Sequence, residues 1–600
     1  MSETAWLVSL FLLFMVIVAV ITVMRVRGTK FDSSDGYFLA GRSLSGWVIA
    51  GSLLLTNLQA SNFVGMSANA YDVNMAVMGY EVFSGVTLIV VALFLVPRYL
   101  KQGITTIPDF IESRFGPGTR NFVTILFLVL YVVNLVPVTL YAGAVALSGM
   151  FNVPELFGIS QFASVTIFVW LIGVVGGAYA IFGGLKAVAI SDSINGIALI
   201  IGGLLVPVLG FWFLGRIDGG GFSAGLDRFL TTDPEKFNAF GAADDPNLPF
   251  TAAITGLILV NLYYWGTDQS VIQRALGAKN LAQAEKGVLI AGLLKVLTPF
   301  MLIIPGIMAA QALIEVPEGQ TSDSIYPLFA AQVLPVPLLA FVAAALMGAI
   351  LSTFNSVLNS ASTLYATNVY KPYFGKNAPE AKVVRSGKWF AIVVALIGLF
   401  ASPFLMYTGT GLFTWLQMVN GFFNVPIFTI ILLGYVTKRV SSRAANIGLA
   451  FFVVCYGLSQ TVFSAQVADA GLHFMHVSAI LFVITSLLIL ALGRLWPRET
   501  PYQLPENHVV EMYPWPYRYR MAGFVMGTMI SMYVLFSTFG IASGHGLSLS
   551  AVATIAALIA GGTLIGVWAD RRWPAARPPA EGGEDAGGAE PEQAALTEPA

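Results

Sequence analysis

The sequence predicts an all-α polytopic membrane protein. Of its 600 residues, 56% are hydrophobic and only 10% carry a charge, a composition typical of chains that cross a bilayer many times. Windows of about 20 mainly apolar residues, the length that spans a bilayer as a helix, recur from residue 6 to residue 569. The net charge of −1 gives no indication of nucleic-acid binding.

Fifteen windows qualify as candidate spans, and we expect about 14–15 transmembrane helices. The first is interpreted as a retained helix rather than a signal peptide, because its basic residues follow the apolar stretch. The ninth is long enough for a short amphipathic piece followed by a tilted helix. The windows are 6–26, 46–70, 77–98, 120–150, 160–182, 187–215, 250–272, 284–313, 327–368, 386–408, 411–437, 443–463, 474–496, 519–541 and 549–569.

Lys and Arg concentrate in alternate loops, which indicates that those loops are cytoplasmic. Basic residues follow the first, third, seventh, ninth, eleventh, thirteenth and last spans, whereas the short loops at 71–76, 151–159 and 464–473 carry none. The alternation predicts an amino terminus outside and a carboxyl terminus in the cytoplasm. The segment 573–600 is rich in Pro, Ala, Gly and Glu and is predicted to be a disordered cytoplasmic tail.

The second span is interrupted by polar side chains. Five of the seven residues from Thr56 to Asn62 are polar, which is unusual for a transmembrane helix. One explanation is a helix broken at this point, whose freed carbonyls line a cavity. The other is an intact helix whose amides form hydrogen bonds with neighbouring helices.

The ninth span carries a small polar face. Ala349, Ser352 and Thr353 lie on one side of a helix by the i, i+3, i+4 rule. Two hydroxyls and a backbone carbonyl are hard oxygen ligands, suited to an alkali cation when a second segment supplies more carbonyls. The ordinary alternative is that each hydroxyl bonds back to the backbone of its own helix.

Lys295 is the most informative single residue. It lies roughly 16 Å into its span by the helical rise, near the bilayer midplane, where charged side chains are costly and usually face a cavity. The ordinary interpretation is a structural ion pair with Glu81. Asn261 and Gln417 add uncharged donors and acceptors deep in other spans. Together these groups suit a ligand covered in hydroxyls.

Motifs for other sources of free energy are absent from the sequence. It has no G-x-x-x-x-G-K-[ST] phosphate loop, which argues against ATP hydrolysis. It has no H-E-x-x-H motif, and its one G-x-S-x-G pattern, Gly221 to Gly225, lies in a Gly- and Asp-rich loop between two spans rather than at a strand-to-helix elbow, so we do not expect an enzyme. His473 and His476 share a helical spacing near a loop without a cluster of Cys or carboxylates, and are interpreted as interfacial residues rather than a metal site. A gradient is therefore the expected energy source.

Several short motifs run in order through about 400 residues: Tyr37 to Leu44, Phe63 to Ser67, Tyr80-Glu81, Phe182 to Leu185, Asn261 to Gly266, Ile272 to Arg274, Lys295, and Leu358 to Ser360. Together they resemble the sodium/solute symporter family, in particular its sodium/glucose–galactose cotransporter branch and the bacterial members of that branch. The resemblance implies a leucine-transporter-like inverted-repeat core of ten helices at 31–440, with flanking helices at 1–30 and 441–572. For bacterial members it implies a multi-pass protein of the inner membrane.

The resemblance also implies roles for individual residues. It places the sugar site at Asn62, Glu81, Ser84, Asn261, Lys295 and Gln417. It places the outer gate at Met66, Tyr80 and Phe413, with Tyr264 as an inner aromatic stack. Sodium, the coupling ion, would bind carbonyls of Leu55, Leu58 and Ala349 and hydroxyls of Ser352 and Thr353. A second sodium would use Asp192, Asn355 and Ser356, where Asn355 stands in a place that relatives fill with a hydroxyl.

These features predict a sodium-coupled symporter for a neutral monosaccharide, whose partners are the sugar, sodium and the lipid bilayer. Other solutes of the same family remain alternatives, namely an inositol, an amino acid, pantothenate or sialic acid. Carboxylate solutes normally require a fixed cation, most naturally a bidentate Arg, and no Arg lies deep in a core span. A sensor that binds a solute without moving it is a further alternative, although such proteins usually carry a soluble signalling domain.

Overall fold

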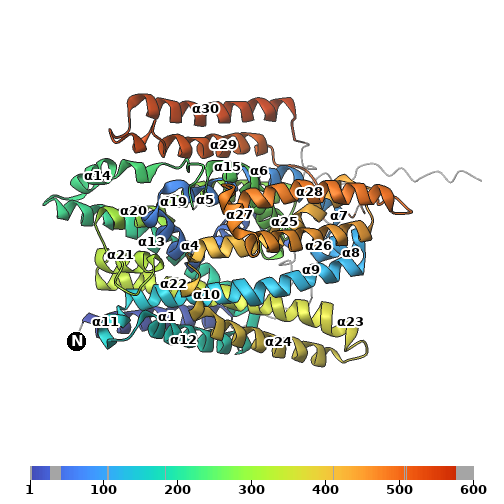
Figure 1. The fold of residues 1–600 in the computed structure, drawn as a ribbon, viewed down its shortest axis with the longest axis horizontal. Coiled ribbons are helices and arrows are strands. Elements are labelled where there is room, and N and C mark those ends of the chain that lie inside the picture. The colour runs from blue at the N-terminus through green and yellow to red at the C-terminus, as the bar shows by residue number, and fades with distance from the viewer. Residues whose placement is uncertain are drawn as a thin grey trace, which may run out of the picture.

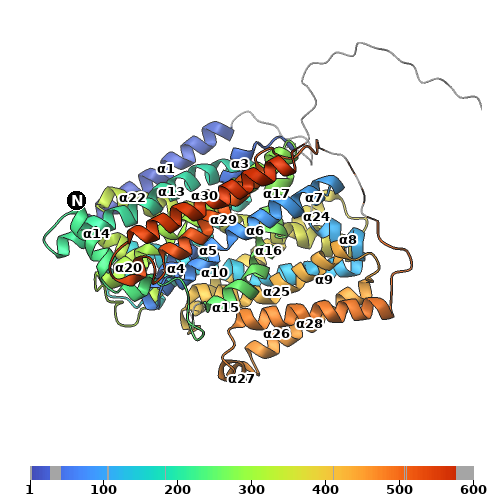
Figure 2. The same cartoon turned by 90° about the horizontal axis from the view of Figure 1, so that it is seen from above.

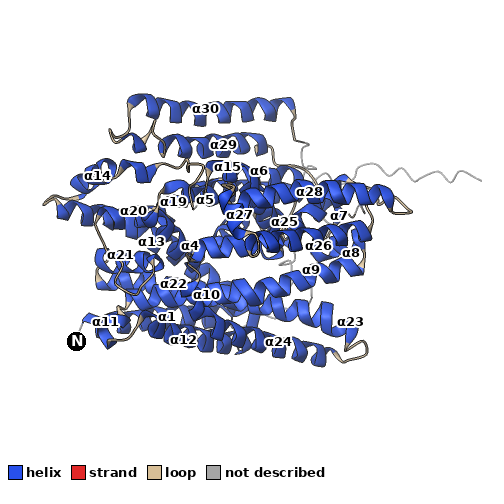
Figure 3. Ribbon diagram, in the orientation of Figure 1, coloured by secondary structure: helices blue, strands red, loops and turns tan. Residues whose placement is uncertain are grey.

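The computed structural model describes residues 3–26, 42–104, 107–182, 184–246, 248–409, 411–503 and 510–575, together with 505 and 507. Within these ranges the regular structure is helical, and β-pairing is limited to isolated bridges such as Leu44 with Ala278 (Figures 1 and 3). The all-α prediction is confirmed. The predicted tail beyond residue 575 and the first part of the 37–44 motif lie outside the described residues.

The first half of the chain forms the helices that precede the long outer loop. They are α1 Glu3–Val26, α3 Gly46–Asn57, α4 Ala60–Asp72, η2 Met75–Met78, α5 Gly79–Val82, α6 Ser84–Val90, η3 Val91–Leu95, α7 Val96–Gln102, α8 Ile107–Phe115, α9 Pro117–Leu130, η4 Tyr131–Leu135, α10 Val136–Met150, α11 Val153–Phe157, α12 Gln161–Phe182, α13 Gly184–Ile217, α14 Phe222–Thr231 and η5 Pro234–Phe237.

The second half continues in the same way. Its helices are α15 Phe250–Ala252, η6 Ala253–Leu257, α16 Ile258–Gly266, α17 Gln269–Leu276, α18 Leu281–Leu297, α19 Pro299–Leu302, α20 Ile304–Gln311, η7 Ser322–Ser324, α21 Ile325–Val333, α22 Val336–Leu364, η8 Tyr365–Tyr370, α23 Lys371–Tyr373, α24 Glu380–Ala401, η9 Ser402–Tyr407, α25 Leu412–Val436, α26 Ser442–Gln460, α27 Ser464–Asp469, α28 Phe474–Leu495, α29 Arg518–Leu535, η10 Ile541–Ser543 and α30 Leu549–Arg572.

Many of these helices are long and apolar enough to cross a membrane. By length and composition the described residues contain nine such helices, or up to ten when the bent pair Leu281–Leu297 and Pro299–Gln311 counts as one span. Each of the fifteen sequence windows coincides with one or more helices, some of them short or interrupted. The ninth window divides into a short α21 and a long α22, as expected.

The second span is broken, as one of the two sequence interpretations proposed. Helix α3 ends at Asn57 and α4 begins at Ala60, while Leu58 and Gln59 between them have ψ angles of 91° and 157°. The Asn62 side chain turns back and donates to the carbonyl oxygen of Asn57 over 3.2 Å. Part of the backbone freed by the break is therefore satisfied by a nearby amide.

Two further breaks were not predicted. Helices α16 and α17 are separated at Thr267 and Asp268. The 284–313 window, expected as one helix, bends by 40° between α18 and α19. Pro299 begins α19 and has no backbone N–H to continue the ladder of α18, which accounts for the bend.

Helices α4 and α10 run through the interior of the bundle. Eleven of the thirteen residues of α4 and fourteen of the fifteen residues of α10 are buried. The α29–α30 hairpin lies along one edge in Figure 1, with α12 and α24 at the opposite edge, and the view from above in Figure 2 shows α26 and α28 at the outside. Helix α29 packs against α18 and α6, so the hairpin lies against two of the helices that carry the site described next.

Candidate functional site

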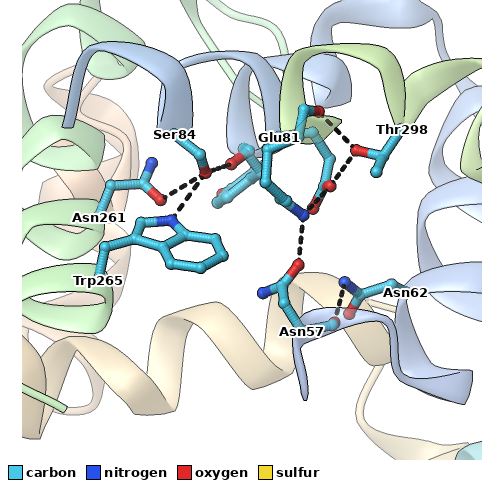
Figure 4. A network of polar contacts seen from close by, with 9 residues as sticks. Asn57, Asn62, Glu81, Ser84, Asn261, Trp265 and Thr298 are labelled. Carbon is cyan, nitrogen blue, oxygen red and sulfur yellow. Dashed lines mark hydrogen bonds and ion pairs between the residues drawn. The ribbon is translucent and has the colours of Figure 1, made fainter. Parts of the chain in front are cut away.

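Lys295 and Glu81 form an ion pair in the interior. The Lys295 Nζ donates to Glu81 Oε2 and to Asn57 Oδ1, and the Thr298 hydroxyl donates to the same Glu81 oxygen (Figure 4). The Lys295 and Glu81 side chains are only 1% and 3% exposed. The ordinary interpretation of Lys295 as the partner of Glu81 is thus what the structure shows, with Asn57 and Thr298 as additional partners.

Three separate chain segments position this cluster. Asn57 is the last residue of α3, where the second span breaks. Glu81 lies in the single-turn helix α5, which follows η2. Asn74 caps the start of η2 by accepting a hydrogen bond from the Ala76 N–H over 2.8 Å. Lys295 lies in the last turn of α18. The cluster therefore lies where three helices end or bend.

A second polar group adjoins the first. Ser84 Oγ donates to Asn261 Oδ1 and to the Tyr80 carbonyl, both over 3.2 Å, and accepts from Trp265 Nε1 over 3.0 Å (Figure 4). The Asn261 side-chain nitrogen is buried and has no hydrogen-bond partner among the described residues. Because an unpaired buried donor costs free energy, this amide is suited to bind a ligand acceptor.

Gln417 lies apart from these two polar groups. It is half-buried on α25 and accepts a hydrogen bond from Asn420 over 3.2 Å, and Asn420 in turn accepts from Asn134 of η4. Asn62 is 8% exposed and bonds the backbone of Asn57, as described above. The structure therefore brings Glu81, Ser84, Asn261 and Lys295 into two adjoining hydrogen-bonded groups, and connects Asn62 to them only through Asn57.

The aromatic residues predicted as a gate lie close together. The rings of Tyr80 and Phe413 meet edge to face with centroids 4.9 Å apart. Met66 is 1% exposed, and a Cβ on Gly65 would lie 2.6 Å from the Phe413 Cβ, so α4 and α25 approach closely there. Tyr264 is half-buried and contacts Trp265 edge to face at 5.1 Å.

The residues predicted to bind sodium come from two segments. Leu55 of α3 and Leu58 in the break after it form one, and Ala349, Ser352 and Thr353 of α22 form the other. Helix α13 packs against both α3 and α22. A Cβ on Gly196 of α13 would lie 2.5 Å from Leu55 Cδ2, and a Cβ on Gly348 of α22 would lie 2.2 Å from the Asn195 side chain. Leu55 and Ala349 therefore flank one small region of close packing. The glycines permit this approach because each lacks a side chain.

The hydroxyls of Ser352 and Thr353 do not donate a hydrogen bond to the backbone of their own helix. Thr363 on the same helix does form such a bond, to the Asn359 carbonyl oxygen over 2.9 Å. Ser352 and Thr353 make no hydrogen bond to any described residue and are half-buried. Two adjacent oxygens without a partner fit the chemistry of a cation ligand.

The predicted second cation site is only partly described. The side chain of Asp192 lies outside the described residues, and Ser356 is exposed. Asn355 is 3% exposed, and neither its amide oxygen nor its amide nitrogen has a hydrogen-bond partner among the described residues. Buried amides are normally paired, so Asn355 is a second unsatisfied polar group on α22.

Three residues of the site were not predicted to take part in it. In the sequence, Asn57 belongs to the polar run of the second span, but that run does not indicate that its amide contacts Lys295. Trp265 belongs to the motif Asn261 to Gly266, which assigns no role to its N–H. Thr298 follows Lys295 by three residues and precedes Pro299, and this spacing was the available signal, because it places the hydroxyl on the same helix face as Lys295.

Comparison with known proteins identifies the family. The family model described as "SSF: Sodium:solute symporter family" matches residues 37–451. The chain belongs to the sodium:solute symporter family. It is therefore a multi-pass membrane transporter with sodium as its coupling ion, and enzymatic activity is not part of that family assignment.

Two relatives of this symporter align over most of its length. The uncharacterized symporter YidK of Escherichia coli (strain K12) is 40% identical over 565 residues, covering 94% of this chain and 96% of that protein. The sodium/glucose cotransporter of Vibrio parahaemolyticus is 34% identical over 442 residues, covering 70% of this chain and 78% of that protein.

A solved structure shows the fold of this symporter. It is that of a Na⁺-coupled sialic acid symporter in a substrate-bound outward-open state, with a TM-score of 0.64, covering 84% of this chain and 98% of that one. Sequence identity to it is 19%, so the likeness concerns the fold alone. It confirms the leucine-transporter-like core that the motifs predicted.

Proposed function

We propose that this protein is a sodium-coupled symporter of a neutral monosaccharide of the glucose or galactose type. The observation that carries the proposal is the buried Lys295–Glu81 pair. The two charges cancel inside the bundle, while several hydrogen-bonding groups in and beside the pair have no partner among the described residues. A pocket of this kind has donors and acceptors but no net charge. That chemistry matches hydroxyl groups.

The uncommitted groups define what a solute must offer. The described partners of Glu81 all bond Oε2, so Oε1 accepts no hydrogen bond from a described residue. Asn261 has its side-chain nitrogen unpaired. One free acceptor and one free donor complement a sugar hydroxyl, which both donates and accepts.

An anionic solute fits less well. A carboxylate needs a cation that is not already neutralised, and Lys295 is engaged by Glu81. Arg114, a fully buried arginine, donates to the carbonyl oxygens of Gly434, Thr437 and Val440 around the end of α25 and so is also engaged. The 34% identity to the Vibrio parahaemolyticus sodium/glucose cotransporter supports the sugar assignment.

The proposed roles of the individual residues follow from these contacts. Glu81, Ser84, Asn261 and Lys295 would bind sugar hydroxyls directly, with Asn62 and Gln417 completing the pocket after rearrangement. Tyr80, Phe413 and Met66 would close over the sugar on the outer side, and Tyr264 on the inner side. Alternating access would then expose this site to one side of the membrane at a time.

Sodium would link the broken second span to the ninth span. Its proposed ligands are the carbonyls of Leu55, Leu58 and Ala349 and the unpaired hydroxyls of Ser352 and Thr353. The unpaired amide of Asn355, with Asp192 and Ser356, would hold a second sodium. A tenfold sodium gradient supplies ~1.4 kcal/mol and a potential of 100 mV adds ~2.3 kcal/mol per charge, so one sodium would support roughly 500-fold accumulation.

The experiment is uptake into proteoliposomes with and without an inward sodium gradient, using labelled glucose, galactose, myo-inositol, proline, pantothenate and sialate. We expect sodium-dependent accumulation of a hexose and its loss in Asn261→Ala. Thr429→Val is a matched control, because the Thr429 hydroxyl is buried and bonds only Val425 O over 2.7 Å. Accumulation of an anionic solute with none of any hexose would exclude the sugar assignment, and binding without accumulation would indicate a sensor.

The proposed location is the inner membrane of a bacterium. The multi-pass helices require a bilayer, and the 40% identical relative comes from Escherichia coli. Fractionation of an expressing bacterial cell would test this, with recovery in the inner-membrane fraction expected.

A further inference from the structure

Thr298 makes a contact with Glu81 that the geometry of its own helix does not explain. Its hydroxyl donates to Glu81 Oε2 and to the Lys295 carbonyl oxygen, the latter over 2.7 Å, and the residue is 3% exposed. The carbonyl of Lys295 would ordinarily accept from the N–H of residue 299, four positions on. That residue is Pro299, which has no N–H.

The hydroxyl of Thr298 therefore has two acceptors for one proton. Its own backbone N–H already bonds the Lys295 carbonyl over 3.1 Å, so that carbonyl is satisfied without the side chain. The Glu81 carboxylate, in contrast, accepts from the described residues only this hydroxyl and the Lys295 ammonium. Charge-assisted hydrogen bonds are the stronger class, so the hydroxyl matters most at Glu81.

The contact determines which carboxylate oxygen is free. Lys295 and Thr298 both approach Oε2 of Glu81 from α18. Two donors on one oxygen resist rotation of the carboxylate and leave Oε1 without a partner among the described residues. A carboxylate held by Lys295 alone could rotate and exchange its two oxygens.

We propose that Thr298 is a positioning and specificity residue of the solute site. It acts through Glu81, holding the carboxylate so that Oε1 accepts a hydrogen bond from one hydroxyl of the solute. This inference rests on the proposed function, since it assumes that Glu81 binds a hydroxylated solute. It goes further by naming the residue that makes Glu81 selective for a hydroxyl at one position of that solute.

The test uses Thr298→Val, which keeps the shape and removes the hydroxyl, and Thr298→Ser, which restores it. The solute is whichever hexose the unaltered protein accumulates, together with its monodeoxy analogues. We expect Thr298→Val to raise KM about tenfold while kcat and the sodium concentration for half-maximal uptake stay within twofold. Thr298→Ser should return KM to within about threefold of the original value.

Selectivity gives a second readout. The hexose should be preferred over the deoxy analogue that lacks the Glu81-bound hydroxyl, and Thr298→Val should reduce that preference about tenfold. Thr429→Val, which removes a buried hydroxyl bonded only to its own helix, should leave both quantities unchanged. A purely structural role for Thr298 would lower kcat and thermal stability without changing KM or selectivity.

The outcomes separate the two proposals. If the unaltered protein accumulates no hexose, the proposed function is wrong. If it accumulates a hexose and Thr298→Val has an unchanged KM and selectivity, the role of Thr298 is wrong. Should Thr298→Val fail to fold, Thr298→Cys carries the same test, because a thiol is a weak donor of similar size and should show the same rise in KM.

Discussion

The ammonium group of Lys295 and the carboxylate of Glu81, 214 residues apart in the sequence, form an ion pair with side chains only 1% and 3% exposed. Removing one member of a buried pair leaves an uncompensated charge, which typically costs about 3–5 kcal/mol. Replacing both members by apolar residues is often nearly neutral. Stability and transport should therefore respond differently to single and double substitution.

We predict that Lys295→Met and Glu81→Leu each lower the thermal stability of the purified protein markedly, and that the double variant recovers most of that loss. None of the three should accumulate the solute. Asp218→Asn is a control, because it breaks the Arg228–Asp218 pair, in which Asp218 is 45% exposed, and such pairs contribute only about 0–1 kcal/mol. Equal stability of the single and double variants would contradict the prediction.

The sodium requirement of transport should depend on the adjacent hydroxyls of Ser352 and Thr353 on α22. Ser352→Ala and Thr353→Ala each delete a proposed oxygen ligand and should raise the sodium concentration for half-maximal uptake severalfold, with a smaller effect on the KM for the solute. Thr363→Ala on the same helix is the control, since that hydroxyl bonds only its own backbone. An unaltered sodium requirement in both alanine variants would mean that the cation binds elsewhere.

The contact between α4 and Phe413 gives a steric test of the gate. In Gly65→Ala the new methyl group would lie 2.6 Å from the Phe413 Cβ, so Phe413 would have to move from its edge-to-face contact with Tyr80. We expect the maximal uptake rate to fall severalfold, because the gate cannot close fully. Gly51→Ala, where a Cβ meets nothing within 4 Å, should transport normally.

Asp323 provides a pH-dependent contribution to stability. It lies in the short helix η7 between α20 and α21, is 3% exposed, and accepts hydrogen bonds from Leu412 N and the Tyr141 hydroxyl over 3.4 and 3.3 Å. Burial raises the pKa of this carboxyl from 3.8 to about 6, against the lowering effect of both hydrogen bonds. The folded protein therefore binds the proton more tightly than the unfolded chain does.

The sign of the effect follows from that pKa. Stability from Asp323 is fully present below pH 3.8 and is lost as the pH rises to about 6, which amounts to ~3 kcal/mol. Asp323→Asn should therefore raise the melting temperature at pH 7.5 and leave it almost unchanged at pH 4. Glu318→Gln, an exposed carboxylate between α20 and α21, should show no such difference, and a gain for Asp323→Asn at both pH values would contradict the pKa assignment.

The predicted orientation can be tested with single cysteines. In a Cys455→Ala background, a cysteine at Ser464 should react with an impermeant maleimide on intact cells, and one at Glu499 should react only after lysis. Both positions are exposed and lie at opposite ends of α28. Equal labelling of the two on intact cells would mean that the number of preceding spans is wrong.

The sequence by itself determined the fold class, the approximate positions of the spans and the unusual character of Lys295. All three follow from one physical quantity, the free-energy cost of placing polar groups in a bilayer. That cost depends on local composition and can be estimated from the sequence alone. The polar run of the second span allowed either a broken helix or an intact one with hydrogen-bonded amides, and the structure decides for the break after Asn57.

Only the tertiary structure decided which groups meet. That Glu81 is the partner of Lys295 was one of several possibilities until α5 and α18 were placed together. The spacing of three residues indicated only that Thr298 shares a helix face with Lys295, and the structure shows that its hydroxyl donates to the same Glu81 oxygen. Gln417, a suitable amide by sequence, bonds Asn420 instead. A span's depth in the membrane is a property of local composition, whereas a hydrogen bond depends on the distance and angle between two groups, which the packing of the helices sets.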